Sequence, residues 1–176
     1  FAIYDPSGVS CIVPALRYSY LFDFSVPSRE GNKLVVFLTS LPEESMGILE
    51  CVFAADQSAR SSFASVLVKI HQSVDGRIRN RAENRWPSMR GRGATWDQRP
   101  ASALLDEAAL VVTGASSVAL EAVCRGVPVI VSGRPAGISF NVLEGIDQQL
   151  WRIAYDSREF QQLAREWLPH VPDLAT

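Results

Sequence analysis

Short apolar runs alternate with amphipathic stretches along most of this chain. Residues 33–41 are almost continuously apolar, as expected of a parallel strand buried on both faces. Five further strands are predicted at residues 65–70, 93–96, 110–113, 127–131 and 151–155. Between them the pattern predicts helices at residues 42–55, 75–84, 101–108, 117–125 and 157–167, the last with Ser157 as its N-cap.

Strands that alternate with helices of about ten residues indicate an α/β fold, a Rossmann-like doubly wound parallel sheet of about six strands. Ligands of such sheets bind beyond the carboxyl ends of the strands, where the strand order reverses. With the order 3-2-1-4-5-6, that point lies between the first and fourth predicted strands. Eight residues would then share one rim: Thr39, Ser40, His71, Gly114, Ser116, Ser117, Gly133 and Arg134.

Composition narrows the class of protein. The chain has 176 residues, of which 47% are hydrophobic and 20% charged, enough for one compact domain. A net charge of −2 gives no general attraction to nucleic acid or to anionic lipid. The three cysteines are widely spaced and odd in number, which suits a reducing cytosol and predicts a cytoplasmic protein.

Metal and membrane signals are absent from the sequence. Two histidines and no Asp-x-Asp triplet predict neither a metal site nor an organic cofactor. No apolar run reaches the roughly 18 residues that a membrane-spanning helix needs.

Residues 1–30 carry aromatics and prolines without periodicity. We interpret them as a linker or the end of a preceding acceptor domain, with a nucleotide-sugar-binding domain over residues 31–176.

Residues 109–131 carry most of the functional signal. They are predicted to form a strand, a turn with Gly114, Ser116 and Ser117, a helix, and a second strand. Backbone N–H groups and hydroxyls at such a turn favour an anionic ligand, so phosphate binding is expected. The turn also looks like that of short-chain dehydrogenases, but Val118 and Leu120 stand where those enzymes need glycines, and no Tyr-x-x-x-Lys follows.

The stretch from Ser116 to Ile130, with Glu121, Ala122, Gly126 and Pro128, resembles the donor-nucleotide half of GT-B glycosyltransferases. The resemblance covers roughly residues 33–168. It is strongest to bacterial sialyltransferases, polysialyltransferases and glycerophosphate transferases of surface polymers. These bind a CMP- or CDP-linked donor through a His-Pro motif and a Ser/Thr motif, which implies these roles for His71 and for Ser116 with Ser117.

Each implied role has a plainer alternative. Gln72 replaces the proline of the His-Pro motif, and His71 could instead bond to a neighbouring loop at the end of its strand. The two serines could cap the helix. Glu121 matches a glutamate that contacts the donor ribose in retaining GT-B enzymes, or it could be a solvated charge. Those enzymes carry another glutamate where this chain has Thr113, which argues against the retaining subgroup.

Two glycine-bearing turns flank the fifth predicted strand. Gly126 suits the C′ position of a helix and Pro128 the start of a strand, so both are assigned structural roles. The turn with Gly133 and Arg134 would lie on the ligand rim. There Arg134 could pair with a diphosphate, or the segment could be a plain surface turn.

Arginines gather between the second and fourth predicted strands, interleaved with Trp86 and Trp96. They are Arg77, Arg79, Arg81, Arg85, Arg90, Arg92 and Arg99. This arginine tract could form a patch for peripheral contact with the inner face of a membrane, or a face for an anionic polymer, sugar or nucleic acid. The commoner explanation is a solvated helix and loop. Nucleic acid is the weakest of these options, and none is expected as a partner.

The sequence thus favours one half of a metal-independent GT-B glycosyltransferase for bacterial surface polysaccharide. It would transfer a sugar from a CMP-, CDP- or UDP-linked donor to a glycan or lipid-linked acceptor. Two alternatives stay open. One is a UDP-sugar 2-epimerase, which shares the fold, and the other is a degenerate domain that serves as a binding or scaffolding module. Any general base would come from the missing acceptor domain.

Overall fold

The structure is a computed structural model, and it describes residues 2–3, 11–12, 31–54, 60–74, 76–91, 93–134 and 141–167. Two short strands, β1 (Ala2–Ile3) and β2 (Cys11–Ile12), pair antiparallel. All other described strands belong to one six-stranded sheet. The strand predicted at residues 33–41 is confirmed, although it ends at Phe37.

The six-stranded sheet is parallel throughout. Its strands are β3 (Lys33–Phe37), β4 (Ser65–Lys69), β5 (Thr95–Trp96), β6 (Ala108–Thr113), β7 (Val129–Ser132) and β8 (Trp151–Ala154). Their order is β5-β4-β3-β6-β7-β8. This is the order 3-2-1-4-5-6 that was assumed in placing the ligand rim, so the strand order reverses between β3 and β6. The fold is a Rossmann-like α/β domain, as the sequence predicts.

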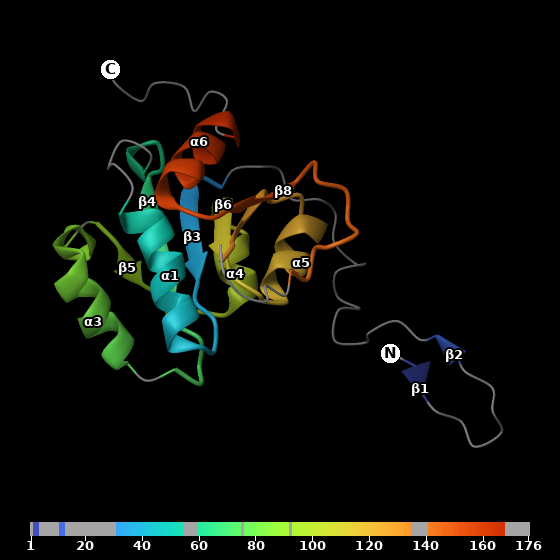
Figure 1. Cartoon of the computed structure of the whole chain (residues 1–176), viewed down its shortest axis with the longest axis horizontal. Helices are drawn as coiled ribbons and strands as arrows, with labels where there is room; N and C mark the ends of the chain where they lie inside the picture. The colour runs from blue at the N-terminus through green and yellow to red at the C-terminus, as the bar shows by residue number, and fades with distance from the viewer. Residues whose placement is uncertain are drawn as a thin grey trace.

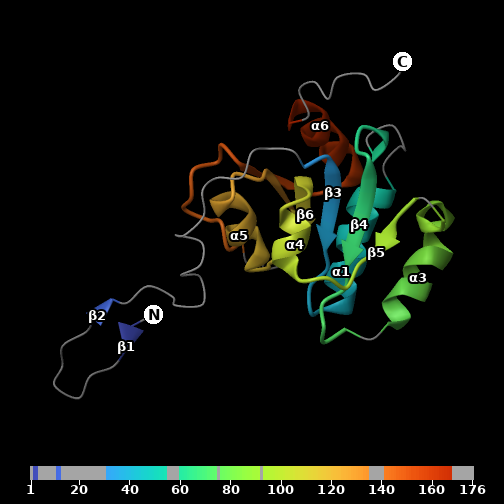
Figure 2. The ribbon, with the colours of Figure 1, turned by 180° about the vertical axis from the view of Figure 1, so that it is seen from behind.

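Helices cover both faces of the sheet. The described helices are α1 (Pro42–Phe53), α3 (Arg77–Arg85), the 3-10 turn η2 (Pro87–Met89), α4 (Ala101–Leu105), α5 (Val118–Cys124) and α6 (Ser157–Trp167). Figure 1 shows α1, α3 and α6 on one side, and Figure 2 shows α4 and α5 on the other. Among the described residues, no helix combines the length and apolarity needed to cross a bilayer.

Strand β3 shows why its run is almost continuously apolar. Leu34 and Val36 face the helices α1, α3 and α6, whereas Val35 and Phe37 face α4 and α5. Each of these four side chains is buried, because alternate residues of a strand point to opposite faces and both faces are covered. The central strands therefore anchor two apolar cores, one on each side.

Two predicted boundaries are wrong. The helix expected at residues 101–108 ends at Leu105, because Ala108 already pairs with Lys33 as the first residue of β6. Ser157 is the first helical residue of α6 and not its N-cap. Asp156 takes that role, since its Oδ1 accepts the amide protons of Arg158 and Glu159, each at 2.8 Å.

Gly126 confirms its predicted place at the end of α5. Its φ of 72° lies in the left-handed region, which favours glycine. The amide of Gly126 donates to the carbonyl of Val123 at 2.9 Å, and that of Val127 donates to the carbonyl of Ala122 at 2.9 Å. This closed turn reverses the chain so that β7 can start beside β6.

Glu107 joins three segments at the start of β6. Its carboxylate accepts hydrogen bonds from Lys33 and Arg99, and Arg99 also pairs with Asp97. The Arg99 hydrogen bond first and the Lys33 hydrogen bond second lower the pKa of Glu107 from 4.5 to about 2. The ionised form is therefore stabilised by folding.

Glu107→Gln is expected to lower the free energy of unfolding by about 1 kcal/mol at pH 7, because the carboxylate is partly solvent-exposed and its pairs are screened. Since folding depresses this pKa, the stabilisation is present above pH 4.5 and is lost as the pH falls toward 2. Urea unfolding across this range should show the two proteins converging. Glu144→Gln, at an exposed loop glutamate, should show no such convergence. A difference that stays constant down to pH 2 contradicts the assignment.

Candidate functional site at the carboxyl edge of the sheet

The loop after β3 forms one side of the point where the strand order reverses. Thr39 is buried in this loop, and Ser40 beside it is exposed. The hydroxyl of Ser45 donates to the carbonyl oxygen of Thr39 at 3.0 Å, and the Ser45 amide donates to that of Leu41 at 2.9 Å. These bonds attach the loop to the first turn of α1, so its position is fixed by that helix.

The loop after β6 forms the other side. The buried hydroxyl of Thr113 donates to the carbonyl of Phe37 at 3.1 Å, which holds the ends of β6 and β3 together. The chain then turns tightly, with the amide of Ser116 donating to the carbonyl of Gly114 at 2.8 Å. Thr39 and Gly114 therefore come from adjacent strands and meet at one place, as the sequence predicts.

Ser116 and Ser117 differ in what their hydroxyls do. The Ser116 Oγ accepts the amide of Val118 at 3.4 Å, a long bond that supports the start of α5. Ser117 occupies the N-cap position, yet its side chain makes no capping hydrogen bond. Glu121 lies one turn later, and Ser117 and Glu121 are both half-buried. Capping thus accounts for Ser116 and leaves Ser117 without a structural role of that kind.

Glu44 links the two loops, and the sequence analysis did not single it out. One carboxylate oxygen, Oε2, accepts the hydroxyl of Thr39 at 2.8 Å, and the other, Oε1, accepts the amide of Ala115 at 3.0 Å. A Cβ added to Gly114 would collide with Oε1 and come within 3.1 Å of Thr39 Cγ2. A carboxylate is therefore bound where the sequence predicts an anion site.

His71 follows the end of β4, one strand away from Thr39. Its Nδ1 accepts the amide of Ser73 at 3.2 Å and lies 2.7 Å from the Ser73 hydroxyl. This is the local loop bond that the plainer alternative foresaw. Because Nδ1 is an acceptor, the neutral ring carries its proton on Nε2, which can donate to a ligand oxygen. Adjacent strands are about 4.8 Å apart, so β4 and β6 are separated by about 10 Å.

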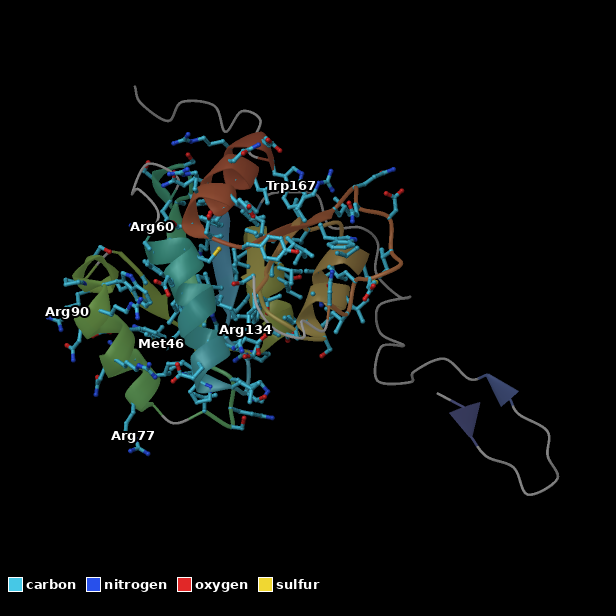
Figure 3. All side chains as sticks on the ribbon, viewed as in Figure 1. Met46, Arg60, Arg77, Arg90, Arg134 and Trp167 are labelled. Atoms are coloured by element: carbon cyan, nitrogen blue, oxygen red, sulfur yellow. The ribbon has the colours of Figure 1, made fainter. Side chains whose placement is uncertain are left out.

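Gly133 and Arg134 follow the end of β7. A Cβ at Gly133 would approach Ile153 Cγ2 within 2.6 Å and the Tyr155 ring within 2.7 Å, so a glycine is required for packing. Arg134 is exposed and lies beside the first half of α1 (Figure 3). Its charge contributes, after that of Arg81, to the lowered pKa of the Glu43 carboxyl. The rest of the glycine-bearing turn, residues 135–140, lies outside the described residues.

A cavity of about 330 Å³ adjoins these residues. The loops after β7 and β8 and one side of α1 line it, and its charged lining residues are Glu44, Glu50, Arg134 and Asp156. This volume lies at the small end of the range for ligand pockets. Glu44 therefore stands between the switch point of the sheet and an open cavity.

Cys51 also lines this cavity, but it is not a reactive thiol. Burial first, and the nearby charges of Asp156 and Glu159 next, raise the pKa of Cys51 to about 12. Its Sγ lies 3.5 Å from the carbonyl oxygen of Asp156. At neutral pH it stays protonated, so it supplies no thiolate nucleophile.

The arginine tract is largely neutralised by carboxylates. Arg81 pairs with Glu43 at 2.7 Å and Arg85 with Glu50 at 2.7 Å, which fastens α3 to α1. Arg79 pairs with Glu83 on α3 itself. Arg77 and Arg90 extend away from the body of the molecule (Figure 3). Arg92 lies outside the described residues. Peripheral membrane contact through this tract stays a prediction.

The two tryptophans of the tract differ in their exposure. Trp86 is only 9% exposed and belongs to the core beneath α3. Trp96 is half-buried, and its indole Nε1 donates to Glu83 at 2.9 Å. Since Trp86 is packed in the interior, the option of a stacking face for sugar or nucleic acid does not extend to that ring.

Metal-binding chemistry has no obvious support at this edge. Within the part of the chain that the structure describes, no three His, Cys, Asp or Glu side chains gather in an arrangement that could hold a metal ion. The groups that can bind an anion there are a backbone amide, hydroxyls, an imidazole and a guanidinium.

Comparison with known proteins identifies the fold. No protein-family model and no curated protein sequence matches the chain. A structure of S. aureus MnaA with UDP is similar to it, with a TM-score of 0.58 and 13% identity over 90% of this chain and 40% of that one. So is a Listeria monocytogenes protein assigned as a UDP-N-acetylglucosamine 2-epimerase, with a TM-score of 0.56 and 16% identity.

The second match covers 80% of this chain and 37% of the Listeria protein. The chain thus spans about two fifths of the length of the proteins it resembles. At these identities the likeness is one of fold. It places the six-stranded domain among GT-B-like α/β domains.

Proposed function

We propose that the chain is the nucleotide-sugar-binding half of a two-domain enzyme that acts on a UDP-linked sugar. The proposal is carried by one observation: 90% of the chain matches part of a protein solved with UDP, and the loops after β3 and β6 meet at the edge where such a fold binds ligands. In this proposal residues 31–176 bind the donor, and residues 1–30 lead from the acceptor half.

Donor binding divides among the loops at the carboxyl edge. The amide of Ala115 and the hydroxyl of Ser117 bind a phosphate oxygen, and His71 donates a hydrogen bond from its Nε2–H to the diphosphate from the loop after β4, two strands away. Glu121 accepts hydrogen bonds from the ribose hydroxyls. About 10 Å separates the ends of β4 and β6, a span that a nucleoside diphosphate can bridge.

Four further residues complete this proposed site. Thr39 and Ser40 lie near the phosphates on the loop after β3, and Gly114 lets the ligand approach the backbone. Arg134 lies at the cavity beyond Glu44 and neutralises charge there. All of them act on the donor by binding and orienting it. The isolated chain is therefore expected to bind nucleotide but to convert substrate slowly or not at all.

A 2-epimerase is favoured over a surface-polysaccharide glycosyltransferase. The two similar structures described above are of a protein with UDP and of a protein assigned as a UDP-sugar 2-epimerase, whereas the transferases that the sequence resembles use CMP- or CDP-linked donors. Gln72 in place of the His-Pro proline is also a departure from those transferases. The other half of the enzyme would supply the acid and base groups in either case.

Calorimetric titration of the whole chain with UDP, CDP, CMP, GDP and uridine tests the proposal. UDP is expected to bind with a Kd below about 1 mM, a free energy of at least about 4 kcal/mol, and uridine to bind more weakly. Ser117→Ala should weaken UDP binding by about tenfold, the value of one charge-assisted hydrogen bond. Ser88→Ala removes an exposed hydroxyl at the opposite edge of the sheet and should leave binding unchanged.

Each alternative predicts a different titration result. A preference for CMP or CDP over UDP would favour a transferase of the sialyl or glycerophosphate type. Absence of binding by every nucleotide at millimolar concentration would favour a scaffold domain that has lost its ligand. Equal effects of Ser117→Ala and Ser88→Ala would remove Ser117 from the site even if UDP binds.

A further inference from the structure

We propose that the carboxylate of Glu44 occupies the phosphate position of this site and has to leave it before a ligand phosphate binds. This inference rests on the proposed function, because it concerns the same anion position. It assigns Glu44 a role in setting the affinity for phosphate ligands.

The contacts of Glu44 are those of a bound anion. Oε1 accepts the backbone amide of Ala115 at 3.0 Å, and Oε2 accepts the hydroxyl of Thr39 at 2.8 Å. Both donors belong to loops that follow central strands of a parallel sheet, where such folds bind phosphates. A charged acceptor makes both bonds stronger than neutral bonds of the same length. The site is thus filled by the protein's own carboxylate.

Gly114 explains how the carboxylate comes so close to the backbone. A side chain there would run into Glu44 Oε1, so the oxygen lies directly over the bare Cα. This approach is also what a phosphate oxygen would need to reach the Ala115 amide. A phosphate and the Glu44 carboxylate cannot share one amide at hydrogen-bond distance, because like charges repel strongly there.

The displaced carboxylate has a place to go. Glu44 lines the cavity of about 330 Å³, and the guanidinium-bearing Arg134 lines the same cavity. Arg134 already acts on the first turn of α1, since its charge contributes to the lowered pKa of the adjacent Glu43. A side chain turned into this cavity would exchange its two hydrogen bonds for attraction to Arg134. Of the other carboxylates there, Glu50 pairs with Arg85 and Asp156 accepts two amide protons of α6.

Competition of this kind raises the intrinsic affinity that a phosphate ligand needs in order to bind. A simple anion gains only the donors that Glu44 gives up, whereas a nucleoside diphosphate also contacts His71 and Glu121 under the proposed function. The internal carboxylate therefore weakens every phosphate ligand by a similar factor. Only ligands with further contacts then bind at useful concentrations.

The test compares Glu44→Gln with Glu43→Gln in titrations with UDP, pyrophosphate and uridine at low salt. Glutamine keeps the shape of the side chain and removes its charge, so Glu44→Gln is expected to tighten UDP and pyrophosphate by about tenfold. Glu43→Gln removes a charge one residue away, where the carboxylate pairs with Arg81, and should change either affinity by less than about twofold. Uridine lacks phosphate and should bind the wild-type chain, Glu44→Gln and Glu43→Gln with equal affinity.

Each outcome supports or overturns the role of Glu44, the proposed function, or both. Tighter binding of both phosphate ligands by Glu44→Gln supports the inference and, with a preference for UDP, the function. Tighter pyrophosphate binding without any affinity for UDP supports the inference and overturns the function. UDP binding that is unchanged or weakened in Glu44→Gln overturns the inference and leaves the function standing. No binding of either ligand by any of the proteins overturns both.

A second measurement covers the case in which Glu44→Gln does not fold. In the wild-type chain, pyrophosphate should shift the amide resonance of Ala115 and the side-chain carboxyl resonance of Glu44 together, with the same saturation curve. A shift of Ala115 while the Glu44 carboxyl stays fixed overturns the inference.

Discussion

Gly114→Ala is expected to weaken UDP binding by at least about a hundredfold, or about 2.7 kcal/mol. The added methyl group would occupy the space now taken by Glu44 Oε1 and would approach Thr39 Cγ2 within 3.1 Å. A phosphate oxygen that reaches the Ala115 amide needs the same space. Titration calorimetry with UDP measures the effect.

The same substitution forces Glu44 away from its donors, so it should also lower the free energy of unfolding by about 1–3 kcal/mol. Binding is therefore measured well below the unfolding temperature, with circular dichroism as the check on folding. Gly76→Ala is the matched control, because a Cβ there meets nothing within 4 Å. If the two alanine variants bind UDP equally, the phosphate position is not beside Gly114.

The sheet was predictable because its strands are buried on both faces. Such strands read as apolar runs, and the run at residues 110–113 and that at residues 65–70 each matched a strand to within two residues at either end. Parallel strands joined by helices then leave few allowed orders, of which one reverses between β3 and β6. The rim that carries Thr39, His71 and Gly114 followed from that order alone.

Local rules failed where tertiary contacts decide the backbone. Residues 106–108 have helix-compatible side chains, but Ala108 pairs with Lys33, and α4 ends before it. Likewise Asp156 outcompetes Ser157 as N-cap of α6, since its carboxylate accepts two amide protons. Helix propensity does not show which of two neighbouring polar residues caps the helix.

The contacts of Glu44 could not be predicted from the sequence. An acidic residue in the first turn of a helix is explained by favourable interaction with the helix dipole, and no further role is needed. Its contact with Ala115 joins residues 71 positions apart, and it depends on how α1 lies across the sheet. The pairs Arg81–Glu43 and Arg85–Glu50 depend on the same placement. Because the sequence does not show that these carboxylates lie beside the arginine tract, the tract looks more basic in the sequence than it is in the structure.

Phe160→Ala is expected to lower the free energy of unfolding by about 3–5 kcal/mol. Phe160 has no solvent exposure and fixes α6 against the core beneath α1, together with Ala154 and Ala164. Its removal leaves a cavity that a helix held at its start by Asp156 cannot collapse to fill. Guanidinium unfolding followed by circular dichroism measures the loss.

Leu163→Ala, at a half-buried position on the same helix, should cost about 1 kcal/mol, since less apolar area is lost. UDP binding below the unfolding transition should survive Phe160→Ala, because Ala115 and Ser117 lie on the loop after β6 and α6 contributes only a cavity wall. A loss of binding in the folded variant would instead mean that α6 itself contributes to the nucleotide site. A cost below about 1 kcal/mol would mean that α6 does not pack as the structure has it.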